Sequence, residues 1–245
     1  MIGALVRRLL VTIVCAGMLL PATLGAEGWN FRLSPYLWAT SLKGTAGIGP
    51  VSGDIDLGFG DILDDLEMAL MLNFRAEKGP WAIQADGVWA DLESEVTSGL
   101  VRTVVDTEMW IVSLNGRYRF AENWEALAGA RYFRQDVGIN VSAGGPGAGA
   151  RGTADWIDPV IGVAFSTSLS DKWTFQAQGD IAGFGLGSDF SWHAWVNFDW
   201  RFSKVASLAL GYRHLDWDYE EGAGATRFSY DAYLSGPVAG VTFRF

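Results

Sequence analysis

The feature that most limits the fold of this chain is a strict alternation of side chains over residues 190–202. One face carries Phe190, Trp192, Ala194, Val196, Phe198, Trp200 and Phe202, and the other is mostly polar. Successive side chains of a strand point to opposite faces, so the pattern predicts a β-strand with one apolar face. The stretch from Trp192 to Phe202 covers about 33 Å, which at a tilt of roughly 40° rises about 25 Å, the height of a membrane barrel's apolar belt.

The same alternation recurs along the chain and predicts an all-β fold with ten strands. We expect strands at residues 29–43, 66–78, 80–92, 104–120, 122–139, 153–169, 172–183, 189–203, 204–219 and 227–245. Eight or twelve strands also fit if the first and last loops are assigned differently.

The connections between these segments alternate in length. Short ones fall at 79–80, 121–123, 170–171 and 203–204, and longer ones at 44–65, 93–103, 140–152, 184–188 and 220–226. Membrane barrels have short periplasmic turns and longer outer loops. The chain is therefore expected to form an antiparallel up-and-down transmembrane β-barrel with both ends in the periplasm. Aromatic residues flank the short turns and should form an interfacial girdle: Trp81, Phe120, Trp124, Trp173 and Phe202.

Both ends of the sequence agree with a location in the outer membrane. Arg7 and Arg8 precede an apolar stretch, and small residues up to Ala26 follow it, which predicts a signal peptide over 1–26 and a barrel domain over 27–245. The last strand ends with Phe243 and Phe245 on its apolar face. We expect this aromatic ending to be the signal that the barrel assembly machinery reads.

Composition excludes several classes of function. The sole cysteine, Cys15, lies in the expected signal peptide, so the mature chain has no disulfide or thiolate chemistry. The chain has 18 basic and 28 acidic residues, and without Arg7 and Arg8 its net charge is about −12, which repels nucleic acid. No cofactor and no specific metal site are expected.

A soluble barrel with an apolar interior would show the same alternation. Tryptophans at the strand ends, the final Phe245, and interior candidates as polar as Arg117 and Asp199 favour the membrane version.

Five segments give the chain a wider likeness: Trp29-x-Phe31 with Pro35-Tyr36-Leu37-Trp38, Phe59-x-Asp61-Ile62-Leu63-x-x-Leu66, Asp155-Trp156-x-Asp158-Pro159-x-x-Gly162, the run from Gly179 to Asp189, and the Gly236-Pro237 ending. In these segments the chain resembles an uncharacterised family of proteobacterial outer-membrane β-barrel proteins. The resemblance spans nearly the whole mature chain. It implies a barrel in the outer membrane, and it implies no reaction and no catalytic residue.

The polar faces of the strands should fill the lumen with charge. Assigned by parity, the interior network comprises Arg32, Asp86, Arg117, Arg119, Arg131, Asp158, Asp180, Asp199, Arg201, Arg213 and Arg244, together with Arg75, Glu77 and Glu125. A ten-stranded barrel is narrow, so these groups are expected to pair across the axis and mostly close it. The alternative is a narrow, cation-preferring pore.

The expected outer loops are acidic. The first contains Asp54, Asp56, Asp61, Asp64 and Asp65, but it lacks the later glutamate of a calcium-binding EF-hand loop. We expect these carboxylates to hold divalent cations loosely, beside those that bridge lipopolysaccharide. Asp61 could cap a short helical turn, and the glycines at 183, 185 and 187 indicate a tight hairpin.

Two histidines were considered for catalysis. His193 shares the polar face of its strand and is expected to be a hydrogen-bonded filler of the lumen. His214 lies near Asp216 and Asp218, and surface proteases of the omptin type also have ten strands with such residues at the rim, but no motif matches. A lipid-modifying hydrolase would instead need Ser229 or Ser235 beside a histidine. The sequence therefore favours a non-enzymatic barrel with a structural or surface-interaction role, and a rim hydrolase using His214 is a second alternative.

Overall fold

The computed structural model describes residues 28–99, 101–143, 147–224 and 227–245, and the expected signal peptide lies outside them. The strands are β1 (Asn30–Trp38), β2 (Ser41–Ile48), β3 (Val51–Leu57), β4 (Leu66–Lys78), β5 (Trp81–Ser98), β6 (Val101–Ala121), β7 (Trp124–Ser142), β8 (Ala148–Ser168), β9 (Trp173–Gly183), β10 (Phe190–Arg201), β11 (Ala206–Glu221) and β12 (Phe228–Arg244). One helix, α2 (Phe59–Asp65), precedes β4. Within the described ranges, no helix is long and apolar enough to cross a membrane.

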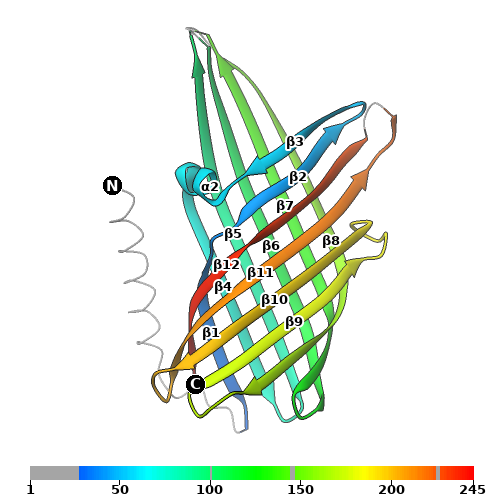
Figure 1. Ribbon diagram of the computed structural model, residues 1–245. Coiled ribbons are helices and arrows are strands. Elements are labelled where there is room, and N and C mark those ends of the chain that lie inside the picture. The colour runs from blue at the N-terminus through cyan, green and yellow to red at the C-terminus, as the bar shows by residue number, and fades with distance from the viewer. Residues whose placement is uncertain (1–27, 100, 144–146, 225–226) are drawn as a thin grey trace.

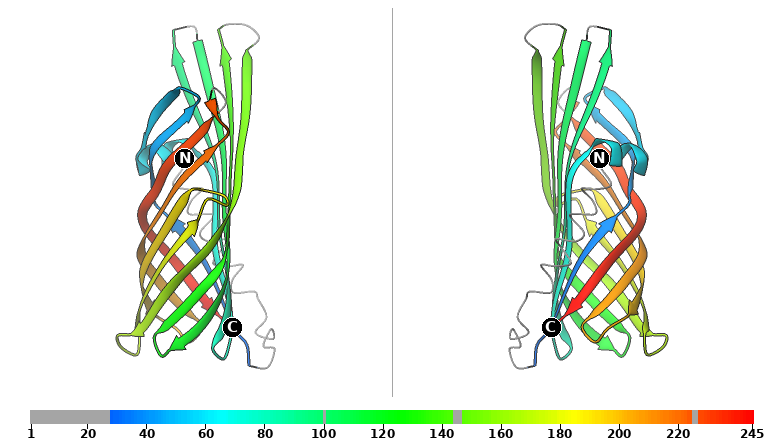
Figure 2. Two further views of the ribbon diagram at one scale, coloured as in Figure 1. Left: turned by 90° about the vertical axis from the view of Figure 1, so that its right-hand side faces the viewer. Right: turned by 90° about the vertical axis from the view of Figure 1, so that its left-hand side faces the viewer.

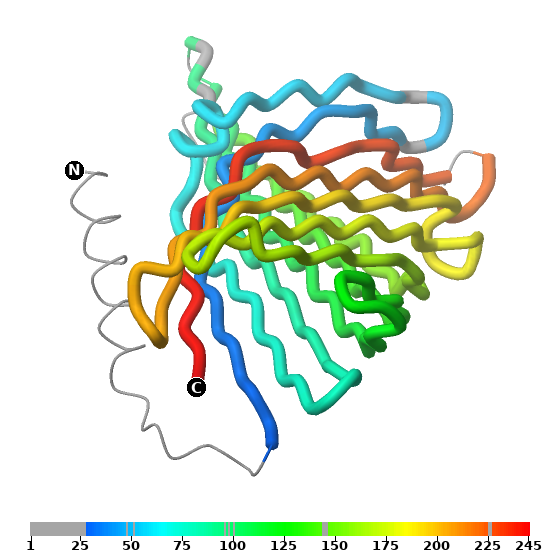
Figure 3. The backbone as a smooth tube through the Cα atoms, turned by 60° about the horizontal axis from the view of Figure 1, so that its bottom comes forward, coloured from blue at the N-terminus to red at the C-terminus, as the bar shows by residue number. Residues whose placement is uncertain are grey.

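Ten of these strands form a closed antiparallel barrel (Figure 1). The order around the wall is β1-β4-β5-β6-β7-β8-β9-β10-β11-β12, and β12 pairs with β1 to close it. Phe31 and Phe245 exchange backbone hydrogen bonds of 3.0 and 3.3 Å at this seam. Figure 3 shows β12 beside β1 at the end where the chain finishes. The predicted ten-stranded up-and-down barrel is confirmed.

The first expected strand, 29–43, is divided in two. β1 pairs with β4 on one side and with the C-terminal half of β12 on the other. β2 does not pair with β4; it pairs with the N-terminal half of β12. β3 then adds to β2 as a further strand outside the barrel. The expected loop at 44–65 is therefore mostly a β-hairpin followed by α2.

Helix α2 differs from the expected capping pattern. Gly58, not Asp61, is the N-cap residue, and Asp61 lies in the first turn, where its carboxylate accepts a 2.8 Å hydrogen bond from the Gly58 backbone N–H. Ile62 packs against the apolar core of the barrel, so the helix lies on the rim of the mouth.

Strands β5 to β8 are much longer than a membrane crossing requires. The segments 93–103 and 140–152, expected as loops, are largely strand, with pairing that continues to Ser98–Val101 and to Val141–Ala148. The ends of these strands farthest from the short turns form what we call the projecting sheet: residues 93–98 of β5, 101–107 of β6, 137–142 of β7 and 148–152 of β8. Figure 2 shows it rising above the other strands, opposite the short turns. We refer to these two ends of the barrel as the hairpin end and the turn end.

The outer wall is apolar and exposed, whereas buried charged side chains occupy part of the interior, which excludes the soluble alternative with its apolar face turned inward throughout. Leu114 on the outer wall is 57% exposed, whereas Arg131 and Arg213 inside are 3% and 1% exposed. The five aromatic residues expected at the short turns are all exposed there, with Trp81 at 62%. This arrangement is that of a barrel surrounded by lipid.

The predicted tight hairpin joins β9 to β10. Gly183 and Gly185 have φ angles of 89° and 70°, values that favour glycine. Asp158 on β8 holds this turn, because its carboxylate accepts hydrogen bonds from the backbone N–H and the hydroxyl of Ser188 at 2.7 and 2.8 Å.

Candidate functional site

The lumen is crossed at mid-height by a layer of charged side chains. Arg213 on β11 lies 2.9 Å from a carboxylate oxygen of Asp86 on β5 and donates a 2.6 Å hydrogen bond to the Tyr36 hydroxyl. Its guanidinium carbon is 4.7 Å from the ring centroid of Trp38 and 4.9 Å from that of Trp195. A guanidinium held between two indoles and a carboxylate has little freedom to move.

A second ion pair continues this layer toward the other wall. Arg131 on β7 donates to Asp180 on β9 at 2.6 Å, and Asp180 lies 2.8 Å from Nδ1 of His193. Arg213 donates to Nε2 of the same imidazole at 3.1 Å. Because Nε2 accepts this bond, His193 is the neutral Nδ1–H tautomer and links the two ion pairs. We call Tyr36, Asp86, Arg131, Asp180, His193 and Arg213 the central ionic layer.

Between the central ionic layer and the hairpin end, aromatic rings fill the lumen. Trp156 stacks on Phe133 with centroids 4.4 Å apart and on Tyr219 at 4.1 Å. Trp217 lies 4.7 Å from Phe133 and 5.4 Å from Tyr230. All five side chains are buried, and we call them the aromatic plug. Charge and aromatic packing together close the barrel on this side.

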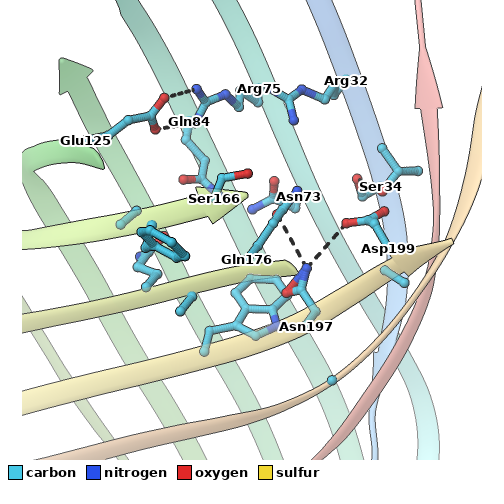
Figure 4. A pocket seen from close by; sticks show the side chains of 18 of the residues that line it. Arg32, Ser34, Asn73, Arg75, Gln84, Glu125, Ser166, Gln176, Asn197 and Asp199 are labelled. Atoms are coloured by element: carbon cyan, nitrogen blue, oxygen red, sulfur yellow. Dashed lines mark hydrogen bonds and ion pairs between the residues drawn. The ribbon is translucent and has the colours of Figure 1, made fainter. Parts of the chain in front are cut away.

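On the turn end of the central ionic layer, the lumen is open. A cavity of about 410 Å³ lies there, and we call it the vestibule. Figure 4 shows Arg32, Arg75, Asn73, Gln176 and Asp199 around it. Tyr36 and Trp195 form its inner wall. A space of this size, lined by amides, hydroxyls and charges, can hold several waters or one small solute.

The structure brings most residues of the expected interior network to the lumen. Asp86, Arg131, Asp180 and Arg213 form ion pairs in the central layer, and Arg32, Arg75, Arg117, Arg119, Glu125, Asp199 and Arg244 line the vestibule. Two members differ from expectation. Asp158 contacts Ser188 and Trp156 rather than an arginine. Arg201 is exposed at the turn end and forms no ion pair with the other described residues.

The acidic residues expected in the first outer loop are spread over several elements. Asp54 and Asp56 lie on β3, where Asp56 forms a 2.8 Å ion pair with Lys43 of β2. Asp61, Asp64 and Asp65 lie in α2. Among the described residues, no group of three or more carboxylates, histidines or cysteines is arranged to hold a metal ion.

The geometry around His214 does not form a catalytic group. His214 lies on the outer wall between the rings of Trp192 and Tyr233, with centroids 4.3 and 5.3 Å away. Its Nε2 is 4.0 Å from the Asp216 carboxylate, beyond hydrogen-bond range. Ser235 lies opposite His214 across β11 and β12, but its hydroxyl pairs with the hydroxyl of Tyr212 at 2.9 Å.

Sequence reasoning missed the aromatic plug and the role of Tyr36. A signal for the plug is present, because lumen-facing positions of the long strands change from polar to apolar toward the hairpin end: Ile111, Phe133, Trp156, Leu215 and Trp217. Three of these five residues are aromatic.

Comparison with known proteins supports the fold. No protein-family model matches the chain, and no curated protein matches its sequence. The crystal structure of the outer membrane protease OmpT from Escherichia coli is similar, with a TM-score of 0.54 and 10% identity over 88% of this chain and 97% of that one. The translocator domain of the autotransporter NalP from Neisseria meningitidis has a TM-score of 0.46 and 12% identity, over 100% of this chain and 96% of that one. The structure of Ail from Yersinia pestis, in complex with a heparin analogue, has a TM-score of 0.39 and 11% identity, over 89% of this chain and 99% of that one.

At these identities the likeness concerns the fold alone. The closed antiparallel wall, the exposed apolar outer surface and the similarity to the OmpT barrel lead to one conclusion. The chain has the fold of a proteobacterial outer-membrane β-barrel protein.

Proposed function

We propose that this chain is an integral outer-membrane barrel with a closed lumen, whose role is to present the projecting sheet for contacts at the cell surface. In this arrangement the turn end faces the periplasm and the hairpin end faces outward. The observation that carries the proposal is the combination of a lumen filled by charge and stacked rings with four strands that continue beyond the membrane. Membrane lipid and lipopolysaccharide surround the belt, the barrel assembly machinery inserts the chain, and divalent cations associate loosely with the acidic outer residues.

The two faces of the projecting sheet differ in character. The face that continues the outer wall carries an ion pair between Glu95 and Arg102, 2.7 Å apart. A second pair, Arg134 and Asp136, lies 2.7 Å apart on the same face of β7, next to the base of the sheet. The face that continues the lumen wall carries exposed apolar residues, Ile139 at 43% among them, together with Val101 and Val141. An apolar sheet face above the membrane is a typical surface for contact with another molecule.

The sheet also has an unpaired edge. β8 pairs with β9 only from Val160 onward, so in the described residues its outer half, Ala148–Pro159, pairs with β7 alone. The backbone N–H and C=O groups on the free side of that edge can accept another strand. The partner that fits is an extended polypeptide segment that adds to β8 and covers the apolar face.

A photo-crosslinking residue placed at Thr153 in intact cells tests this contact. Lysine at Ala150 puts a charge on the apolar face and should abolish the adducts, whereas lysine at Asn140, on the charged face, should leave them unchanged. Both positions are exposed in the projecting sheet. Adducts that persist in the A150K protein, or that never form, would contradict a role for this edge.

Planar-bilayer recording tests the closed lumen. The wild type should show no stable channels. Alanine at Arg131 and Arg213 combined with alanine at Trp156 and Trp217 should produce openings, because it removes both cations of the central ionic layer and two rings of the aromatic plug. Alanine at Arg117, Arg119 and Arg201 should not, because these residues lie on the turn-end side of that layer. Large, stable wild-type channels would contradict the proposal and favour the pore.

A further inference from the structure

Three arginines stand side by side on neighbouring strands of the lumen wall. Arg244 of β12 lies opposite Arg32 of β1, and Arg32 lies opposite Arg75 of β4. Residues opposed in this way have Cβ atoms roughly 4.5–5.5 Å apart, and like charges there are destabilising. A row of three positive charges is therefore not what a purely structural lumen favours.

The first carboxylate near this row is shared among three guanidiniums. One oxygen of Glu77 lies 2.7 Å from Arg32, 2.9 Å from Arg75 and 3.9 Å from Arg119. A single carboxylate carries one negative charge, so it cannot balance all three arginines.

The second carboxylate is shared in the same way. Glu125 lies 2.7 Å from Arg75, 3.0 Å from Arg117 and 3.3 Å from Arg119. Four guanidiniums thus share two carboxylates, so the cluster carries an excess of positive charge. Uncompensated charge inside a barrel is costly, because lipid surrounds the wall.

The end of the row is also under-paired. Arg244 donates a 3.0 Å hydrogen bond to Ser207, and its nearest carboxylate, Asp199, is 3.9 Å away. Its Nη1 is buried and has no hydrogen-bond partner among the described residues. Arg119 and Glu122 both lie at the exposed rim of the vestibule, where water screens their charges. Further inside, four arginines face three carboxylates, which leaves one positive charge in excess: Arg32, Arg75, Arg117 and Arg244 against Glu77, Glu125 and Asp199.

These charges line a space that a ligand could occupy. Arg32, Arg244 and Arg75 border the vestibule of about 410 Å³, beside the hydroxyls of Ser34 and Thr242. Figure 4 shows Arg32, Arg75 and Ser34 along one side of this space. The central ionic layer closes the other side, so a ligand would enter from the turn end.

From the arginine row, the unmatched charge and the cavity, we infer that the vestibule is a binding site for a small periplasmic solute that carries an oxyanion group. Guanidinium forks match the oxygens of phosphate and carboxylate groups. Bound there, the group supplies the missing negative charge and accepts a hydrogen bond from the unpaired Nη1 of Arg244. The inference is independent of any surface contact, since the two sites lie at opposite ends of the barrel.

Thermal unfolding and calorimetry of the purified full barrel test this site, with inorganic phosphate and succinate as probes against sodium chloride at equal ionic strength. A doubly charged probe should raise the melting temperature of the wild type. Glutamine at Arg32 and at Arg244 should each weaken binding about tenfold or more. Arg151→Gln, an exposed arginine of the projecting sheet, should not change it. The stronger of the two probes identifies the phosphate or the dicarboxylate as the preferred group.

A conservative variant guards against a folding defect. Lysine at both Arg32 and Arg244 keeps the charge but loses the fork, and it should retain weakened, measurable binding. Without added anion, R244Q should melt no lower than the wild type, because it relieves repulsion in the row. Equal responses to phosphate, succinate and chloride in the wild type, or undiminished binding in R32Q and R244Q, would overturn the inference.

Discussion

Arg213 and Asp86 lie on opposite parts of the barrel wall, and their side chains meet 2.9 Å apart inside the lumen. Three strands, β12, β1 and β4, separate them around the wall. The Tyr36 hydroxyl bridges the two groups, because it accepts from the guanidinium at 2.6 Å and donates to the carboxylate at 3.1 Å. One contact therefore ties together parts of the wall that share no backbone hydrogen bonds.

Removal of either charge of this pair should strongly destabilise the barrel. Arg213→Met leaves the Asp86 carboxylate buried and uncompensated, and we expect a loss of about 3–5 kcal/mol in the free energy of unfolding. The double variant R213M/D86N should lose less than the sum of the single variants, because no unpaired charge remains. Urea unfolding in lipid vesicles measures this, and strictly additive losses would show that the pair is not coupled.

Two aspartates oppose each other at the outer ends of β11 and β12. Asp218 lies directly across from Asp231, and its pKa is raised by partial burial and by the nearby Asp231, Asp189 and Glu220 carboxylates. A raised carboxyl pKa means that the folded state favours the protonated form. Stability from this group is therefore greatest below the ordinary aspartate pKa of about 3.9 and falls as the pH rises through the raised value.

The Asp231→Asn variant should consequently be more stable than the wild type at pH 7. We expect roughly 0.3 kcal/mol, a small gain because Asp218 is exposed and water screens the repulsion. The difference should shrink as the pH falls through the raised pKa of Asp218, because a protonated Asp218 no longer repels a neighbouring carboxylate. Asp171→Asn, in a short turn at the other end, is the matched control. A gain independent of pH would argue against charge repulsion as its cause.

The aromatic ending is predicted to direct assembly. Phe245→Asp should lower the amount of assembled barrel, measured as the heat-dependent mobility shift of outer-membrane fractions, while barrels already formed keep nearly normal stability. The control is Phe184→Asp, which changes an exposed aromatic of the β9–β10 turn. Equal assembled levels of the F245D protein and the wild type would show that the ending is not read.

Calcium should modestly raise the melting temperature, because five aspartates of β3 and α2 add negative charge at the hairpin end, where divalent cations can associate loosely. Asparagine at Asp54, Asp56, Asp61, Asp64 and Asp65 should remove most of this rise. The relevant measurement is the calcium-dependent difference, since the Asp61 variant also weakens the hydrogen bond to Gly58 in α2. If calcium does not change the melting temperature of the wild type, these aspartates are solvated surface groups that do not bind the cation.

Alternation along the sequence predicts the membrane-crossing strands well. The span expected at 172–183 is observed as Trp173–Gly183, and that expected at 189–203 as Phe190–Arg201. In the belt, lipid on one side and water or charge on the other impose the pattern residue by residue. Beyond the belt that constraint ends, and the segments 93–103 and 140–152 show no alternation that would indicate strands.

Parity also predicts which side chains enter the lumen, but not which of them meet. Contacts such as Arg213 with Asp86 depend on the stagger of ten strands, which brings distant positions to one height. The same holds for the arginine row, because it exists only in the register that sets Arg244, Arg32 and Arg75 side by side. That register follows from closure of the whole barrel, which no single segment specifies.

β12 pairs with three other strands, and this has a consequence for the order of folding. β12 follows all the other described strands in the sequence, yet it pairs with β11, with β1 and with β2. Loop-closure entropy makes contacts between such distant segments late events. The β2–β3 hairpin therefore lacks one neighbour until the chain end arrives, and protection of its amides should report the moment at which the barrel seam closes.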